Sequence, residues 1–200
     1  MPADCRPLRT DAARNRRLLL IAAEDEFADK GADASVADIA RRAGVAKGTV
    51  FRHFATKEKL IAAIVGGHIG ALTDVARGLL GAADAGAALL EFLSVAAGER
   101  QQRDLTFLQS IGEADPEVIR LRDELYATIG GLVYRARESG AVRSDVTSTD
   151  IILLMCAPVH VVQYLSDPAP GLWRRYLAII FDGLRPEGAQ QLPEPAPKDL

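Results

Sequence analysis

The chain of 200 residues contains few of the residues that build disulfide frameworks, metal centres and β-sheets. Neither of its two cysteines, Cys5 and Cys156, stands in a CxxC or Cys/His spacing, so we expect no disulfide framework and no metal site. No run of Val, Ile and Thr alternates with polar residues over the length of a strand, and aromatic residues make up only 6% of the chain. The abundant Ala and Leu instead favour an all-α protein of about nine helices.

The motifs of common enzyme classes are missing as well. No HExxH, GxSxG or phosphate-binding loop occurs, and beyond residue 60 the only histidines are His68 and His160. We therefore expect no enzymatic activity, no catalytic residues and no cofactor. Cys156 lies in an apolar run, where we expect a small core residue, with a redox-sensing thiol as the alternative.

Segments that would direct the chain to a membrane are also missing. The N-terminus lacks the apolar core of a signal sequence. The longest uncharged stretch, residues 151–166, is too short to span a bilayer and is interrupted by Pro158, His160 and Gln163. We therefore expect a cytoplasmic protein with no membrane contact.

Charge is divided unevenly along the chain. Residues 1–60 hold 12 Lys and Arg against 9 Asp and Glu, a net charge of +3, whereas residues 61–200 hold 12 against 18, a net charge of −6. A basic N-terminal part on an otherwise acidic chain is expected when only that part contacts phosphates. Arg14, Arg16 and Arg17 crowd the start of the first predicted helix, where a phosphate backbone or a solvated face explains them equally well.

Residues 35–58, SVADIARRAGVAKGTVFRHFATKE, indicate two short helices joined by a glycine turn. Ser35 is the predicted cap of the first helix, and Gly44 follows it where a left-handed backbone ends a helix at least cost. The charged residues of the first helix, expected to face water, are Asp38, Arg41 and Arg42. The expected core residues are Ile39, Ala40, Val45, Val50 and Phe54. The pattern is typical of a helix-turn-helix, whose second helix enters a major groove of DNA.

This segment resembles the DNA-binding domain of the TetR family of transcriptional regulators. The residues that carry the resemblance are Ile39-Ala40, Ala43-Gly44-Val45, Gly48-Thr49, Phe51, His53-Phe54, Lys57-Glu58 and Leu60. The family usually has a tyrosine at the position of Phe51, where the hydroxyl reaches a backbone phosphate, and Phe51 has no hydroxyl to offer. The resemblance implies a helical DNA-binding head, a helical body and a double-stranded DNA operator as partner.

Position in the motif gives the residues of the second helix their expected roles. Lys47 and Thr49 are candidates for contacts with base edges, Gly48 allows close approach, and Arg52 reaches a base or the backbone. Two further positions, which match phosphate-contacting positions of the family, are His53 and Lys57. The predicted DNA-binding residues are Ser35, Lys47, Gly48, Thr49, Phe51, Arg52, His53 and Lys57. The alternative for each is plain surface exposure, and for His53 a packed loop residue.

Apolar periodicity and capping signals mark the helices outside the motif. They are expected over residues 11–30, 57–80, 87–97, 104–111, 116–139, 150–164 and 171–184. Pro158 should kink the helix that contains it. Gly66, Gly67 and Gly70 interrupt another, either for close packing or as a compliant segment. The expected division is a DNA-binding head at 1–55, an effector-binding and dimerisation body at 56–188, and a loose tail at 189–200.

The last two predicted helices are apolar on more than one side, which indicates a partner on a second face. The family resemblance implies that this partner is a second copy of the chain, packed into a four-helix bundle. It also implies a small-molecule effector in a cavity of the body. Candidate lining residues, each of which is otherwise plain core, are Phe92, Phe107, Leu108, Tyr126, His160 and Gln163.

Together these features predict a ligand-responsive transcriptional repressor. It is expected to bind a palindromic operator as a homodimer and to be released by a small-molecule effector. One alternative is a helical small-molecule binding or enzymatic protein whose helix-turn-helix is only structural. A second alternative is a DNA-binding protein without an effector.

Overall fold

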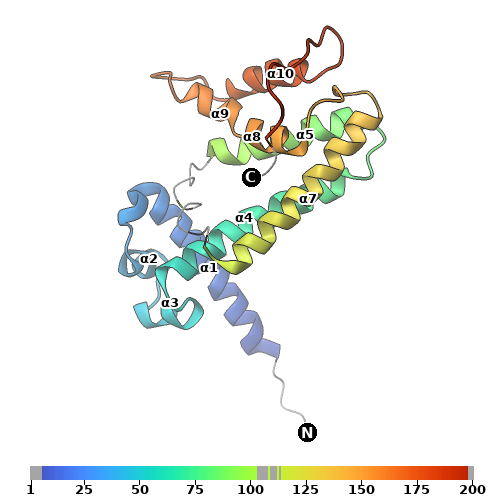
Figure 1. Ribbon diagram of the computed structural model, residues 1–200. Helices are drawn as coiled ribbons and strands as arrows, with labels where there is room; N and C mark the ends of the chain where they lie inside the picture. The colour runs from blue at the N-terminus through green and yellow to red at the C-terminus, as the bar shows by residue number, and fades with distance from the viewer. Residues whose placement is uncertain (1–5, 103–107, 109–111, 113, 198–200) are drawn as a thin grey trace. The chain divides into compact units, whose positions relative to one another are not determined.

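A computed structural model of the chain describes residues 6–102, 108, 112 and 114–197. Over these residues the protein is all-α, with nine α-helices, one 3-10 helix and no strand, which confirms the predicted fold class (Figure 1). The helix predicted over 104–111 lies, apart from Leu108, outside the described residues. The helices group into two compact units, which are described separately below.

Unit 1 comprises Met1–His68 and Asp104–Ile119. Its helices are α1 (Arg6–Lys30), η1 (Gly31–Asp33), α2 (Val36–Arg42), α3 (Lys47–His53) and the first half of α4 (Lys57–Leu79). Buried side chains in this unit include Leu19, Phe27, Ile39, Ala40, Val50, Phe54, Leu60 and Ile61. The expected core positions of the helix-turn-helix are therefore confirmed, except for Val45, which is only half-buried.

The turn between α2 and α3 forms for the reasons that the sequence indicates. Ser35 begins α2 with a capping box, because its hydroxyl accepts from the Asp38 amide at 3.1 Å while the Asp38 carboxylate accepts from the Ser35 amide at 3.4 Å. Gly44 follows α2 with φ +68°, a conformation that side chains with a Cβ disfavour. The Val45 amide then donates to the Ala40 carbonyl at 3.0 Å, which closes the helix end.

Unit 2 comprises Ile69–Arg103 and Arg120–Leu200. Its helices are the second half of α4, α5 (Ala85–Gln102), most of α7 (Pro116–Glu138), α8 (Ser148–Leu154), α9 (Ala157–Val162) and α10 (Trp173–Gly183). One cluster of buried side chains holds these helices together and includes Leu89, Phe92, Leu93, Leu125, Ile129, Leu132, Ile151, Trp173, Leu177 and Phe181. Both α4 and α7 contribute residues to each unit.

The helix predicted over 150–164 is two helices in the structure. The first, α8, ends at Leu154, and α9 begins at Ala157 with Pro158 in its first turn. Proline favours the first turn of a helix because its missing N–H is not needed there, so Pro158 starts a new helix instead of kinking a continuous one. Cys156, at the break, is half-buried.

The glycine-rich stretch of α4 is an uninterrupted helix. A Cβ added at Gly67 or Gly70 would meet no described atom within 4 Å, so close packing does not account for either glycine. The boundary between the two units falls at His68 and Ile69, between these glycines. By length and composition α4 is the one described helix that could cross a membrane, but its buried residues, such as Leu60 and Ala76, belong to the protein's own units.

Candidate nucleic-acid interface

The second helix of the motif, α3, has one buried and one exposed face. Val50 and Phe54 point into unit 1, with exposed fractions of 1% and 4%. Lys47, Gly48 and Arg52 are exposed on the other side of the helix. This arrangement fixes α3 to the unit by its apolar residues and leaves its polar and small residues accessible.

Lys47 and Phe51 lie one turn apart on the exposed face of α3. The Lys47 ammonium lies 5.8 Å from the centre of the Phe51 ring, within the range of a cation–π contact. The Phe51 ring is 43% exposed. The face therefore offers a cation and an apolar ring side by side.

Gly48 and Arg52 form the neighbouring row of the same face. A Cβ at Gly48 would meet no described atom within 4 Å, so the backbone is open to close approach from outside. Among the residues that the structure describes, neither Lys47 nor Arg52 forms an ion pair with a carboxylate. Thr49 and His53 are half-buried, and the His53 ring lies 6.4 Å from that of Phe54.

Lys57 points back toward the protein. Its ammonium donates to the Ala32 carbonyl at 2.7 Å and lies 5.5 Å from the centre of the Phe27 ring. The first turn of α4 is thereby joined to the connection between α1 and α2. This hydrogen bond uses one of the three hydrogens of the ammonium group, so two are left that could donate to a phosphate. The predicted phosphate contact of Lys57 stays a prediction.

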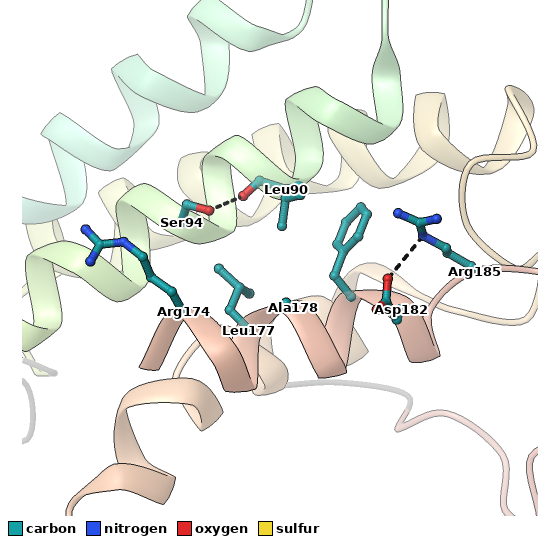
Figure 2. Close-up of a pocket in the computed structure, with 8 residues that line it drawn as sticks. Leu90, Ser94, Arg174, Leu177, Ala178, Asp182 and Arg185 are labelled. Carbon is teal, nitrogen blue, oxygen red and sulfur yellow. Dashed lines mark hydrogen bonds and ion pairs between the residues drawn. The ribbon is translucent and has the colours of Figure 1, made fainter. Parts of the chain in front are cut away.

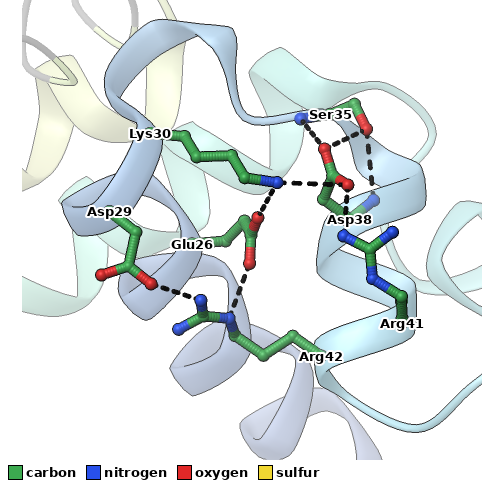
Figure 3. Close-up of polar contacts among 7 residues, drawn as sticks. All are labelled: Glu26, Asp29, Lys30, Ser35, Asp38, Arg41 and Arg42. Carbon is green, nitrogen blue, oxygen red and sulfur yellow. Dashed lines mark hydrogen bonds and ion pairs between the residues drawn. The ribbon is translucent and has the colours of Figure 1, made fainter.

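An ion-pair network joins α1 to α2 (Figure 3). Glu26 is only 3% exposed, yet Lys30 Nζ lies 2.6 Å from its Oε1 and Arg42 Nε lies 2.6 Å from its Oε2. The Lys30 ammonium lowers the pKa of Glu26 below its ordinary value, burial opposes this shift, and Arg42 reinforces it. Glu26 is therefore a buried carboxylate paired with two cations that remain partly exposed.

The same network reaches the other end of α2. Lys30 Nζ lies 3.2 Å from Asp38 Oδ1, and Arg42 also pairs with Asp29. Hydrogen bonding to the Ser35 hydroxyl holds the pKa of Asp38 far below its ordinary value, and Lys30 lowers it further. Arg41 and Arg42 are exposed as expected, whereas Asp38 is only half-buried, and α1 supplies ion-pair partners to both Asp38 and Arg42.

Three exposed arginines extend the basic character of unit 1 along α1. They are Arg14, Arg16 and Arg17. The Arg16 guanidinium lies 5.1 Å from the centre of the Phe54 ring, so this side chain packs beside the end of α3. At least one of the basic residues of α1 thus lies next to the helix-turn-helix.

Unit 2 has a groove between α5 and α10 (Figure 2). Its volume is about 300 Å³, and its lining residues are Leu90, Ser94, Arg174, Leu177, Ala178, Phe181, Asp182 and Arg185. The Arg174 guanidinium lies 4.6 Å from the centre of the Trp173 ring, and Arg185 pairs with Asp182 at 3.4 Å. No sequence signal marked this groove, because α5 and α10 are brought together only by the fold.

The six predicted effector-binding residues do not gather around that groove. Phe92 is in the core of unit 2, and Tyr126 packs against the same core, whereas Leu108 is buried in unit 1. Phe107 lies outside the described residues. His160 on α9 and Gln163 directly after that helix are exposed, and the His160 ring packs edge-on against Tyr164 with centres 5.7 Å apart. Their role stays a prediction.

Large apolar side chains are exposed on α8, α9 and α10 and on the segment just after α9. They are Leu153, Val161, Tyr164, Leu165 and Ile179. Tyr164 is 81% exposed. We call these five residues the C-terminal apolar surface. Over the described residues, no group of three or more His, Cys, Asp and Glu side chains is placed to hold a metal ion.

Comparison with known proteins identifies both parts of the chain. Residues 19–64 match the family model of bacterial regulatory proteins of the tetR family, and residues 84–186 match that of the SbtR-like transcriptional regulator C-terminal domain. The chain is 43% identical over 68 residues to the HTH-type transcriptional repressor Rv3405c of Mycobacterium tuberculosis, which is 34% of this chain and 36% of that protein. The match thus spans about a third of this curated relative's length.

Solved structures match over most of the chain. The TetR transcription regulatory protein from Mycobacterium vanbaalenii is 34% identical, with a TM-score of 0.62, over 90% of this chain and 99% of that one. The TetR transcriptional regulator SCO0520 from Streptomyces coelicolor is 28% identical, with a TM-score of 0.63, over 86% of this chain and 98% of that one. The likeness therefore extends through both units, beyond the helix-turn-helix.

Proposed function

The chain belongs to the TetR family of bacterial transcriptional regulators, and on that premise we propose that it represses transcription by binding a palindromic operator as a homodimer until a small-molecule effector releases it. The observation that carries this proposal is the exposed face of α3. That face combines a cation, a glycine, an arginine and an aromatic ring on a helix whose other side is buried.

In this proposal α3 lies in the major groove with its N-terminal end nearest the bases. Lys47 donates to guanine O6 or N7, and Gly48 lets the backbone approach the base edges. Thr49 contacts a base edge or a phosphate, and Arg52 a base or the backbone. The lack of a carboxylate partner for Lys47 and Arg52 among the described residues supports these roles.

Contacts with the DNA backbone are proposed around the edge of this face. The capped N-terminus of α2 at Ser35 directs backbone amides toward a phosphate, and His53 and Lys57 supply further donors. Arg14, Arg16 and Arg17 add positive charge from α1. These contacts position the protein on the duplex without reading its sequence.

We propose that the C-terminal apolar surface forms the interface of the homodimer. A two-fold dimer presents two copies of α3 to the two halves of a palindrome, which must lie about one helical turn, roughly 34 to 36 Å, apart or a multiple of it. The functional division remains a head at 1–55, a dimerisation and effector-binding body at 56–188 and a tail at 189–200. A regulator that acts on DNA in this way works in the cytoplasm.

The groove between α5 and α10 is a candidate place for the effector. It combines apolar walls from Leu90, Leu177 and Phe181 with the cation of Arg174, and its volume of about 300 Å³ is at the lower end for small-molecule sites. An effector releases the operator only if it prefers the body conformation that binds DNA poorly. To change the ratio of non-binding to DNA-binding conformations from 1:99 to 99:1, the effector must favour the non-binding conformation by about 5.5 kcal/mol.

An electrophoretic shift of the DNA upstream of the protein's own gene tests the proposal. The full chain should bind one duplex in preference to scrambled sequence, and the affinity should fall steeply with salt as counterions are released. Lys47→Ala should reduce this binding. Binding that neither prefers a sequence nor responds to salt would refute a role as a DNA-binding regulator and leave a helical ligand-binding protein as the better interpretation.

A further inference from the structure

The carboxylate of Asp115 joins the first turns of two helices in unit 1. Its Oδ2 accepts from Lys59 Nζ at 2.7 Å, and Lys59 belongs to the first turn of α4. Its Oδ1 accepts from the Glu117 amide at 3.0 Å, which caps α7. The hydrogen bond from Lys59 lowers the pKa of Asp115 below its ordinary value. One side chain thus caps the N-terminus of α7 and forms an ion pair with the first turn of α4.

The first turn of α4 also forms hydrogen bonds with residues that precede it in the chain. The Thr56 hydroxyl accepts from the Lys59 amide at 3.2 Å, and the Lys57 ammonium donates to the Ala32 carbonyl at 2.7 Å. Ala32 lies in the connection between α1 and α2. The turn that carries Lys59 is therefore bound to Asp115 by one lysine and to the connection between α1 and α2 by another.

The residues just before α7 also rest on α4 within unit 1. A Cβ at Gly112 would lie 3.5 Å from Val65 Cγ2 and 3.8 Å from the Cα of Ala62, so the backbone at Gly112 approaches α4 closely. Leu108 is fully buried in the same unit. The Lys59–Asp115 pair therefore lies in the same unit as the close approach of Gly112 to α4.

After its first turn, α7 enters unit 2, where Leu125, Ile129 and Leu132 are part of the core. An α-helix of 23 residues transmits axial displacement along its length, because its hydrogen bonds resist stretching. One continuous helix thus runs from the residue after Asp115 into the core of unit 2.

From these contacts we propose that Lys59 and Asp115 are a pair of positioning residues that couple the packing of α7 to the placement of the helix-turn-helix on DNA. The inference rests on the proposed function and adds to it the residues through which the body communicates with the head. Neither residue touches the operator in this proposal. By linkage, if α7 influences DNA binding, then DNA binding must influence α7 to the same extent.

Reciprocity allows a test that needs DNA alone. The probe is the duplex that the full-length protein selects from random sequence, and the readout is amide hydrogen exchange, by mass spectrometry, of residues 116–124 with and without that duplex. Operator binding should slow exchange there at least about fivefold in the wild-type protein. Lys59→Met and Asp115→Asn, which keeps a cap for α7, should reduce this effect below about twofold.

Two matched variants separate coupling from simple stability. Lys59→Arg keeps the charge and should keep the DNA-dependent protection. Arg120→Met removes an equally exposed cation, one that pairs with Glu124 on its own helix at 3.1 Å, and should also keep it. Melting temperatures of all four variants, measured without DNA, should show that each folds.

The outcomes distinguish the inference from the proposed function. If Lys59→Met and Asp115→Asn bind the operator and retain the protection of α7, or if the wild-type protein shows none, the coupling role is wrong while the DNA-binding function stands. If the wild-type protein selects no duplex, the proposed function fails and the coupling role fails with it.

Discussion

Arg42 Nε lies 2.6 Å from Glu26 Oε2, so the last turn of α2 is fastened to a carboxylate of α1 that is almost fully buried. A buried ion pair is weak evidence of net stability, but removal of one partner leaves the other charge uncompensated. We therefore predict that Glu26→Gln lowers the melting temperature by several degrees and weakens operator binding, because Lys30 and Arg42 each lose the buried one of their two carboxylate partners. Glu91→Gln, at an exposed position of α5, is the control and should change neither.

The pairing of Glu26 with Arg42 should make the free energy of unfolding depend on pH. The pKa of Glu26 is lower in the folded protein than its ordinary value of 4.5, so its contribution to the unfolding free energy is complete above that value. The contribution is lost as the pH falls through the folded pKa. Wild-type stability should therefore fall in acid more steeply than that of Glu26→Gln, as measured by urea unfolding from about pH 6 to pH 3. An equal dependence of the unfolding free energy on pH in the two proteins would show that the ion pair does not contribute to stability.

Much of the fold could be predicted from the sequence because its signals are local. Ser35 caps α2 through Asp38, Gly44 adopts the left-handed backbone, and Pro116 begins α7, all within a few residues of their partners. The pairing of Glu26 with Arg42 spans 16 residues and depends on how α1 packs against α2. Helix periodicity correctly placed Arg42 on the exposed side of α2 but could not show its ion pairs with α1, whereas the i,i+4 spacing of Glu26 and Lys30 indicates their pairing directly.

The candidate site was predictable to a similar extent. The motif placed Lys47, Gly48 and Arg52 on one exposed face, because helix periodicity fixes which residues share a side. The contact between Lys47 and Phe51 follows from the same i,i+4 rule and could have been expected. The groove between α5 and α10 could not, since its walls come from segments some 80 residues apart.

We predict that Lys47→Ala weakens operator binding by about 1 to 3 kcal/mol and relaxes the preference at one base pair, as expected for a residue that reads a base edge. The affinities of the wild-type protein and of Lys47→Ala for every single-base variant of the selected duplex, measured at fixed salt, check both predictions. Arg137→Ala, at an exposed position of α7, should leave the binding profile unchanged. A uniform loss at all positions would instead assign Lys47 to the phosphate backbone.

Phe51→Tyr should strengthen binding. The ring is 43% exposed, and a hydroxyl at its end would add one hydrogen bond to a phosphate, a gain of about 0.5 to 1.5 kcal/mol. The gain should appear equally on the selected and scrambled duplexes, because a phosphate contact carries no sequence information. Phe51→Leu is the control for ring loss, and an unchanged affinity of Phe51→Tyr would place the ring away from the backbone.

Glycines in two different settings should respond in opposite directions to alanine. Gly44→Ala should destabilise the protein by about 1 to 2 kcal/mol, because φ +68° is strained for a residue with a Cβ. Gly67→Ala should stabilise it by about 0.5 to 1 kcal/mol, because the position is helical and no described atom lies within 4 Å of the added Cβ. Urea unfolding of both variants checks the signs. Stabilisation by Gly67→Ala combined with lost effector response would identify a compliant segment in α4.

The C-terminal apolar surface should prove to be the dimer contact. Tyr164→Glu and Ile179→Glu each place a carboxylate in an apolar interface, where desolvation of an unpaired charge is costly, so both should shift the protein from dimer to monomer in sedimentation velocity. Tyr134→Glu is the matched control, because Tyr134 is also a large exposed residue of unit 2 but lies on α7, outside that surface. Operator binding should fall with dimerisation, since two linked heads bind a palindrome far more tightly than one. A stable dimer in both Tyr164→Glu and Ile179→Glu would show that the interface lies on another face of the chain.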